Sequence, residues 1–161
     1  MATYPQTRSV HSITEQAAGS KGTYDPAELS APTQKLITAL PFGVMVTQGT
    51  NGYDKVTSTS TAVVGALPIS VTAGDFKNGR YLANDAVAPI RRGYLFVKID
   101  PANKPTATNL RVSYDTGKEG WLTSEATNSK AFAPNSGIKL ENVYDTVAEV
   151  YFSGLPEYPL T

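Results

Sequence analysis

Glycine and proline recur along this chain at short intervals and leave no room for a coiled coil. The 161 residues include 13 glycines and 11 prolines, together with 31 serines and threonines. Glycine and proline interrupt helices, whereas β-branched residues such as threonine favour strands. The chain is therefore predicted to be all-β, with short strands separated by turns.

The apolar stretches between these turns predict the strands. Segment 36–49 is expected to form two strands interrupted at Pro41, and Asn51-Gly52 is a candidate type I′ turn that pairs this segment with a strand over 56–61. Segment 94–99 is apolar on both alternating faces, so we expect it to be a central strand. Further strands are predicted at 66–72, 80–82, 110–114, 121–124 and 146–152. Their regular spacing favours a small β-sandwich or β-barrel-like domain.

The two ends of the chain differ from its middle. The first 34 residues contain three prolines and show neither helical nor alternating periodicity. We interpret residues 1–34 as an extended N-terminal arm, residues 35–155 as the β-rich domain and residues 156–161 as a C-terminal tail. Within the arm, the pattern from Asp25 to Glu28 is typical of a helix start, limited to one or two turns. On this interpretation the domain folds without residues 1–34.

Charge and composition exclude several function classes. Fourteen basic and fourteen acidic residues give a net charge of zero, so no positive surplus favours binding to nucleic acid or to an anionic membrane. The chain has no cysteine, which excludes disulfides, thiolate metal sites and cysteine nucleophiles. The longest apolar stretch, 62–69, is too short to span a bilayer, and the N-terminus lacks an apolar signal core. We expect a protein made in a cytoplasm.

Catalytic and cofactor signatures are weak. The single histidine, His11, lies in the predicted arm, away from any acid or nucleophile. The glycine spacing of 74–79 resembles a phosphate loop, but arginine and tyrosine follow where lysine and a hydroxyl residue are required. A glycosidase-type carboxylate pair could be drawn from four acidic residues, Asp100, Asp115, Glu119 and Glu141. Most of them adjoin predicted turns, where acidic residues are usually solvated or cap the turn. We expect no enzyme activity, no cofactor and no metal site.

Tyrosines are the most informative side chains. There are nine, and Tyr4, Tyr24 and Tyr158 lie in terminal, proline-containing segments that a domain core is not expected to reach. Tyrosine combines a large apolar ring with a polar tip and is enriched where proteins meet. We therefore predict a protein interface, with a partner or with another subunit, at these tyrosines and at Arg8 and Leu29 in the same arm.

Four segments carry a resemblance to a known family: 40–50, with its Pro-Phe-Gly strand entry, 93–99, 110–114 and 148–152. Together they make the chain, over roughly residues 36–153, resemble the structural cement, or head-decoration, proteins of tailed bacteriophages. These are patterns of strands and turns, without a catalytic signature.

The resemblance implies a non-enzymatic module on the outside of the assembled phage head. Its implied partner is the major capsid protein, whose neighbouring subunits it would hold together. It also implies a homotrimer at local three-fold positions of the capsid, without nucleic acid or membrane as partner.

A second hypothesis belongs to a different class of protein. A β-sandwich that binds carbohydrate or attaches to a host would use an exposed aromatic platform, and Trp121 is the only tryptophan. Because Trp121 follows Gly120 at the start of a predicted strand, a core position is the more common reading of such a residue. Saturable binding to a glycan array would favour the second hypothesis.

Overall fold

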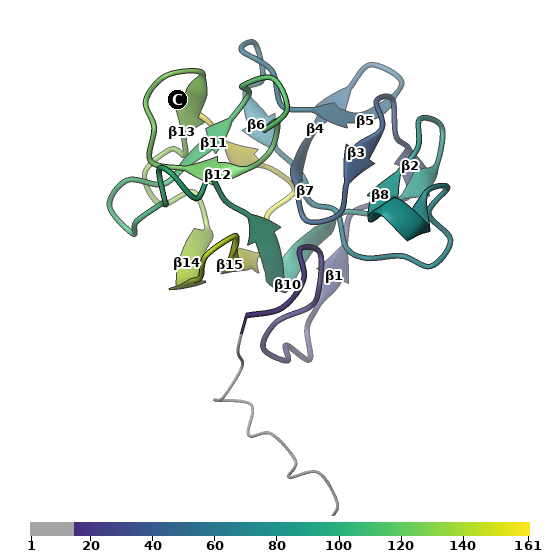
Figure 1. Cartoon of the computed structure of the whole chain (residues 1–161), viewed down its shortest axis with the longest axis horizontal. Coiled ribbons are helices and arrows are strands. Elements are labelled where there is room, and N and C mark those ends of the chain that lie inside the picture. The colour runs from purple at the N-terminus through teal and green to yellow at the C-terminus, as the bar shows by residue number, and fades with distance from the viewer. Residues whose placement is uncertain (1–14) are drawn as a thin grey trace, which may run out of the picture.

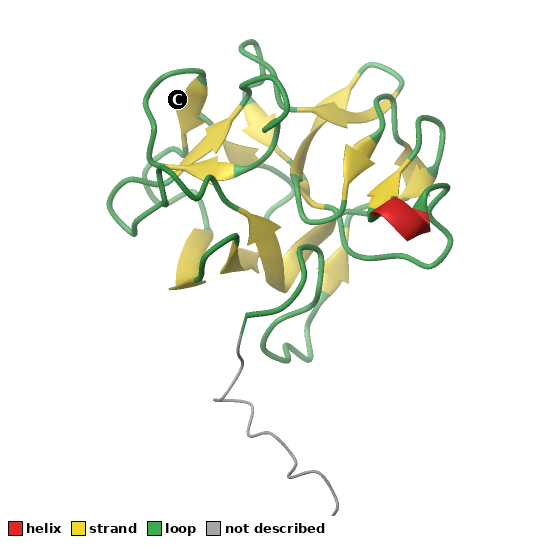
Figure 2. Cartoon of the chain, in the orientation of Figure 1, coloured by secondary structure: helices red, strands yellow, loops and turns green. Residues whose placement is uncertain are grey.

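The computed structural model describes residues 15–161, which form sixteen short strands and one short 3-10 helix, η1 (Figures 1 and 2). The all-β prediction is confirmed. No helix in residues 15–161 is long and apolar enough to cross a membrane. In chain order the elements are β1 (Leu29–Ser30), β2 (Gln34–Lys35), β3 (Leu40–Pro41), β4 (Met45–Gly49), β5 (Gly52–Lys55), β6 (Ala62–Val63), β7 (Gly65–Ala66), η1 (Phe76–Asn78), β8 (Arg80–Tyr81), β9 (Ala86–Val87), β10 (Ile90–Lys98), β11 (Arg111–Ser113), β12 (Leu122–Thr123), β13 (Ser129–Ala131), β14 (Ile138–Val143), β15 (Val147–Ser153) and β16 (Tyr158–Pro159).

The longest strand, β10, lies in the middle of the largest sheet. The strand order is β14-β15-β10-β7-β4-β5, and β1 also pairs with β10. β10 is antiparallel to β15 from Arg92 to Lys98, and the side chains of Leu95, Phe96 and Val97 are fully buried. Apolar residues on both faces of one strand require cover on both sides, as predicted for 94–99.

Two apolar clusters share one wall, formed by β4, β6 and β7. Successive side chains of a strand point to opposite faces, so Met45 enters one cluster while Val44 and Val46 enter the other. Val63 and Val64 divide in the same way. In Figure 1 the β11–β13 sheet and the β3, β5 and β8 strands accordingly lie on opposite sides of this wall.

The predicted hairpin exists, with its turn one residue earlier. β4 and β5 pair with Gly49 opposite Gly52, so the turn residues are Thr50 and Asn51. Gly52 belongs to the strand because β2 passes close to it. A Cβ atom at residue 52 would lie 2.2 Å from the Lys35 carbonyl oxygen, an approach that glycine alone permits.

Other strand predictions need correction. Segment 56–61 is a turn, in which the Ser60 hydroxyl accepts a hydrogen bond from the Thr57 amide at 2.9 Å. The predicted strand 66–72 is reduced to Gly65–Ala66, because the chain turns where the Ala73 amide bonds to the Ser70 carbonyl. The sequence analysis assigned no strand to β13 or β14, whereas both are present.

The described part of the predicted arm is hydrogen-bonded to the sheet. The Gly19 amide donates to the Phe96 carbonyl at 2.7 Å, and the Gly22 amide donates to the Tyr94 carbonyl at 2.9 Å. Further on, β1 pairs with β10 and β2 pairs with β9. Because removal of residues 1–34 would break these contacts with β10 and β9, we expect it to destabilise the remaining domain.

The predicted C-terminal tail is also part of the fold. β16 pairs with β6, so that Tyr158 lies opposite Val63. The Tyr158 side chain is fully buried in the cluster of β10 and β15, where it packs edge-on against Phe152 with ring centroids 5.6 Å apart. The core therefore reaches a segment that the sequence analysis placed outside it.

Candidate functional site

A short segment of residues 19–31, here called the arm root, runs antiparallel to β10. Residues 19–22 bond to the second half of β10, and Leu29 and Ser30 pair with its first half. Between them the chain leaves the ladder as a loop of residues 23–28. The arm root thus adds an interrupted strand to the sheet and presents one exposed loop.

A buried carboxylate fixes the start of this loop. The side chain of Glu149 is 2% exposed and accepts hydrogen bonds from the Thr23 amide at 2.8 Å, the Thr23 hydroxyl at 3.1 Å and the Asn142 side-chain amide at 3.1 Å. A Cβ atom at Gly22 would lie 2.2 Å from Glu149 Oε2, so glycine is required for the carboxylate to come this close. Buried charges need such donors.

The loop of residues 23–28 is held by polar contacts at its base, and its tip is exposed. Asp25 accepts a hydrogen bond from the Ala27 amide at 2.8 Å, so the predicted helix start is a single turn capped by Asp25. An ion pair of 2.6 Å joins Lys21 to Glu28 across the loop. Tyr24 projects from it with 76% of its surface exposed.

The five predicted interface residues have different positions. Tyr4 and Arg8 lie outside the described residues. Tyr24 and Leu29 are both exposed and belong to the arm root, so the structure brings them together. Tyr158 does not join them, because its side chain is buried and its hydroxyl bonds to the Arg91 carbonyl and the Gly154 amide. A side chain enclosed in this way offers no surface to a partner.

A second exposed feature escaped the sequence analysis. Four of the large hydrophobic residues that are exposed in the described chain fall within residues 69–82, here called the apolar loop. Val71 is 80% exposed, and the others are 38–47% exposed. These four residues are Ile69, Val71, Phe76 and Leu82. The sequence analysis placed Ile69 and Val71 in a predicted strand over 66–72 and Leu82 in one over 80–82, and a short apolar run does not reveal which of its side chains are covered.

The apolar loop is held by polar contacts of its own. The Asp85 carboxylate accepts hydrogen bonds from the amides of Gly74 at 2.7 Å and Leu82 at 2.8 Å. At its tip, a 2.7 Å hydrogen bond from the Arg80 guanidinium to Asp75 lowers the pKa of the aspartate. Burial raises the pKa of Tyr81 to about 12, and its hydroxyl donates to the Pro68 carbonyl, directly before the loop. These contacts fix the conformation of the apolar loop.

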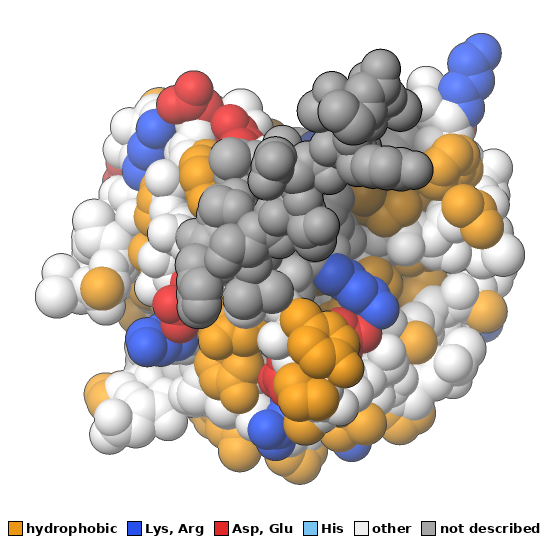
Figure 3. Space-filling view, turned by 90° about the horizontal axis from the view of Figure 1, so that it is seen from below, with side chains coloured by type: hydrophobic (Ala, Val, Ile, Leu, Met, Phe, Trp, Pro, Cys, Tyr) orange, Lys and Arg blue, Asp and Glu red, His pale blue; other side chains and the backbone are white. Residues whose placement is uncertain are grey.

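The apolar loop and the arm root meet. The Ile69 amide donates to the Gly19 carbonyl at 2.9 Å, and a Cβ atom at Gly19 would lie 3.0 Å from the Ile69 nitrogen. Figure 3 views the molecule from the side where the described chain begins, and orange hydrophobic side chains lie there among uncharged, basic and acidic side chains. Exposed apolar surface of this kind marks sites where proteins associate.

The candidate catalytic features have structural roles. Asp100 and Glu119 lie near different lysines, Lys118 at 3.3 Å and Lys55 at 3.9 Å. The glycine-rich segment 74–79 forms η1, and its aspartate bonds to the arginine that follows. No group of three or more metal-ligating side chains lies together within residues 15–161. His11 is outside the described residues.

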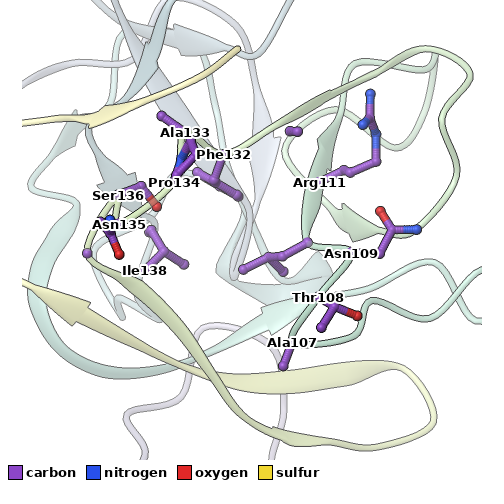
Figure 4. A pocket seen from close by; sticks show the side chains of 13 residues that line it. Ala107, Thr108, Asn109, Arg111, Phe132, Ala133, Pro134, Asn135, Ser136 and Ile138 are labelled. Atoms are coloured by element: carbon purple, nitrogen blue, oxygen red, sulfur yellow. The ribbon is translucent and has the colours of Figure 1, made fainter.

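Two features bear on the carbohydrate hypothesis. Trp121 is half-buried against the apolar cluster that contains Val44 and Val46, and the Lys98 ammonium lies over its ring, 5.3 Å from the centroid. A separate cavity of about 550 Å³ has Asn135 and Ser136 on one side and Asn109 and Arg111 on the other (Figure 4). The guanidinium of Arg111 already donates to the Ser129 hydroxyl at 2.7 Å.

Comparison with known families decides among these readings. A family model described as "Structural cement protein (E217 gp24/Pam3 gp6)" matches residues 4–152. The chain belongs to this family. Structural cement proteins are non-enzymatic components of phage capsids, so the predicted absence of enzyme activity is confirmed and this cement protein is a capsid-associated component of the virion.

A solved structure has the same fold. A chain from "The capsid of Myoviridae Phage XM1" superposes with a TM-score of 0.72 and 19% sequence identity, covering 96% of this cement protein and 100% of that chain. No curated protein matches the sequence. The resemblance noted on residues 36–153 thus extends over nearly the whole chain, and the phage cement family inferred from it is correct.

Proposed function

We propose that this cement protein binds the outside of the assembled phage head and stabilises contacts between neighbouring major capsid subunits. The observation that carries the proposal is the set of exposed apolar side chains on the arm root and the apolar loop, two segments that the Ile69–Gly19 hydrogen bond joins. It combines the exposed Tyr24 and Leu29 with the exposed Ile69, Val71 and Phe76. Family membership supplies the capsid as the partner.

Stabilisation follows from mass action. A protein that binds only the assembled shell must dissociate before the subunits it bridges can separate. Many copies on one lattice then act together, because linked sites raise the effective concentration without new contacts. The net charge of zero allows dense decoration with little repulsion between copies.

The exterior position and the trimer are part of the same proposal. We propose three copies at each local three-fold position, with the arm of each copy reaching a neighbouring capsid subunit. The arm supports this through Tyr4 and Arg8, which precede the arm root in the sequence. Light scattering tests the oligomeric state, both of the isolated protein and of cement protein released from decorated heads.

Binding to purified expanded heads that lack cement protein tests the proposed surface. Val71→Ser removes the most exposed of the apolar side chains, and we expect head affinity to fall by about 1–2 kcal/mol while the free energy of unfolding stays within about 0.5 kcal/mol. The matched control is Val143→Ser, since Val143 is 38% exposed on β14 and belongs to neither the arm root nor the apolar loop. Equal binding of Val71→Ser and Val143→Ser would contradict the proposed surface.

Truncation tests the arm separately. A protein lacking residues 1–14 retains the arm root and its hydrogen bonds to β10, so we expect it to fold normally and to bind heads more weakly. Unchanged binding would show that Tyr4 and Arg8 do not contact the capsid.

A further inference from the structure

A pocket lies beside the start of the described chain, at the end of β10. Its volume is about 380 Å³, and it is separate from the apolar loop and from the cavity of Figure 4. Three chain segments and the indole of Trp121 enclose it. The lining residues are Gln16, Ala17, Ala18, Lys98, Ile99, Pro101, Trp121, Thr146 and Val147.

Lys98 contributes the one charged side chain of this mostly apolar lining. The Lys98 ammonium lies 5.3 Å from the Trp121 ring centroid, and burial lowers the pKa of Lys98. Within residues 15–161, no carboxylate lies within 4 Å of its nitrogen, in contrast to Lys21, Lys104 and Lys118. A partly desolvated ammonium without a counter-charge is stabilised by any anion that reaches it.

The chain does not supply that anion itself. Glu15 is adjacent to the pocket, but its carboxylate accepts hydrogen bonds from the Thr146 amide and hydroxyl, both at 3.3 Å. Residues 1–14 contain no aspartate or glutamate. Neither Glu15 nor residues 1–14 therefore offer Lys98 a carboxylate, which leaves its ammonium to pair with an anion of another molecule.

The lining defines the chemistry of this molecule. The ammonium favours a carboxylate, and the faces of Trp121, Pro101 and Val147 favour an apolar stem next to it. Gln16 to Ala18 form one wall and lead directly into the arm root, so an occupant here would lie beside the surface proposed to face the capsid.

We propose that this pocket receives an aspartate or glutamate side chain of the major capsid protein, with its carboxylate on Lys98 and its methylene stem against Trp121. This inference rests on the proposed function. It adds a charge-specific contact to a surface that is otherwise apolar. Such a contact fixes the orientation of the cement protein on its lattice site, because an apolar surface alone has little directionality.

Two substitutions and one control test the charge. Lys98→Met keeps the length of the side chain and removes the ammonium, and we expect about 10- to 100-fold weaker binding to expanded heads. Lys98→Arg keeps the charge and should bind within about 5-fold of the unsubstituted protein, since arginine also pairs with carboxylates. In the control, Lys104→Met, the lost ammonium already has Asp145 at 3.4 Å, so head binding should not change.

A second measurement reports on the pocket directly and not on head affinity. Trp121 is the only tryptophan, so 5-hydroxytryptophan incorporated in its place can be excited selectively in the presence of heads. Its emission should shift when the unsubstituted protein binds, because the occupant displaces water from the indole. Lys98→Met at saturating heads should show a smaller shift.

The outcomes separate the two proposals. If the unsubstituted protein does not bind expanded heads, the proposed function fails. If it binds with an unchanged emission, or if Lys98→Met binds as tightly as the unsubstituted protein, the head-binding function stands and the carboxylate pocket is wrong.

Discussion

Glu149 holds the arm root to the sheet, and its replacement by alanine tests that reasoning. The substitution removes the acceptor of the Thr23 amide, the Thr23 hydroxyl and the Asn142 side chain. A hydrogen bond to a charged group contributes about 1.5–3 kcal/mol. The side chain is 2% exposed, so its removal also leaves a cavity. Burying the carboxylate carries a desolvation cost that offsets part of this.

The expected net loss is about 2–4 kcal/mol in the free energy of unfolding, since Thr23 and Asn142 are near enough to the surface to regain water. For a chain of this length, that corresponds to a fall in melting temperature of roughly 5–15 °C. Urea unfolding followed by tyrosine and tryptophan fluorescence measures the loss. Glu149→Gln keeps an acceptor of the same shape and should lose only about half as much.

Hydrogen exchange localises the effect. The Gly22 amide donates to the Tyr94 carbonyl at 2.9 Å, and its protection should fall in Glu149→Ala more than that of the β10–β15 ladder. A loss of less than about 0.5 kcal/mol would refute the anchoring role. So would a uniform loss of protection with Gly22 no more affected than the ladder.

Two further predictions concern the buried core. Tyr158→Phe removes the hydroxyl that bonds to the Arg91 carbonyl and the Gly154 amide, so we expect a loss of about 1–2 kcal/mol in urea unfolding and unchanged head binding; weaker head binding at unchanged stability would restore the interface role predicted from the sequence. Burial raises the pKa of Asp100, but hydrogen bonds from its neighbours and the nearby Lys118 outweigh it and leave the pKa lowered. Asp100 therefore stabilises the fold fully above the unfolded-state pKa of about 4, and this contribution is lost as the pH falls through the lowered folded-state value. The stability difference between the unsubstituted protein and Asp100→Asn should be constant above about pH 5 and shrink at more acidic pH; a difference that shrinks toward neutral pH instead would contradict it.

The parts of the fold that local patterns determine were predictable. Segment 94–99 is apolar on both faces, and such a strand is stable only when covered on both sides, as β10 is. The β4–β5 hairpin was also found, although its turn is displaced by one residue. The close contact between the Lys35 backbone and Gly52 accounts for the displacement. A contact with another strand cannot be predicted from the local sequence pattern.

The candidate site was less predictable because it depends on long-range pairing. Tyr158 is buried by its pairing with β6, and a two-residue strand next to proline shows no periodicity. Residues 66–72 were predicted as a strand, whereas the chain turns there and Val71 is 80% exposed. Tyr24 and Leu29 were predicted as interface residues of the arm; both are exposed, and their role in an interface stays a prediction.

A cryo-EM map of expanded heads decorated with this protein tests the central claim most directly. The account predicts that the protein lies on the outer surface, with residues 15–31 and 69–82 against the major capsid protein. It would be contradicted by a map in which these two segments face solvent, or in which the protein lies inside the shell.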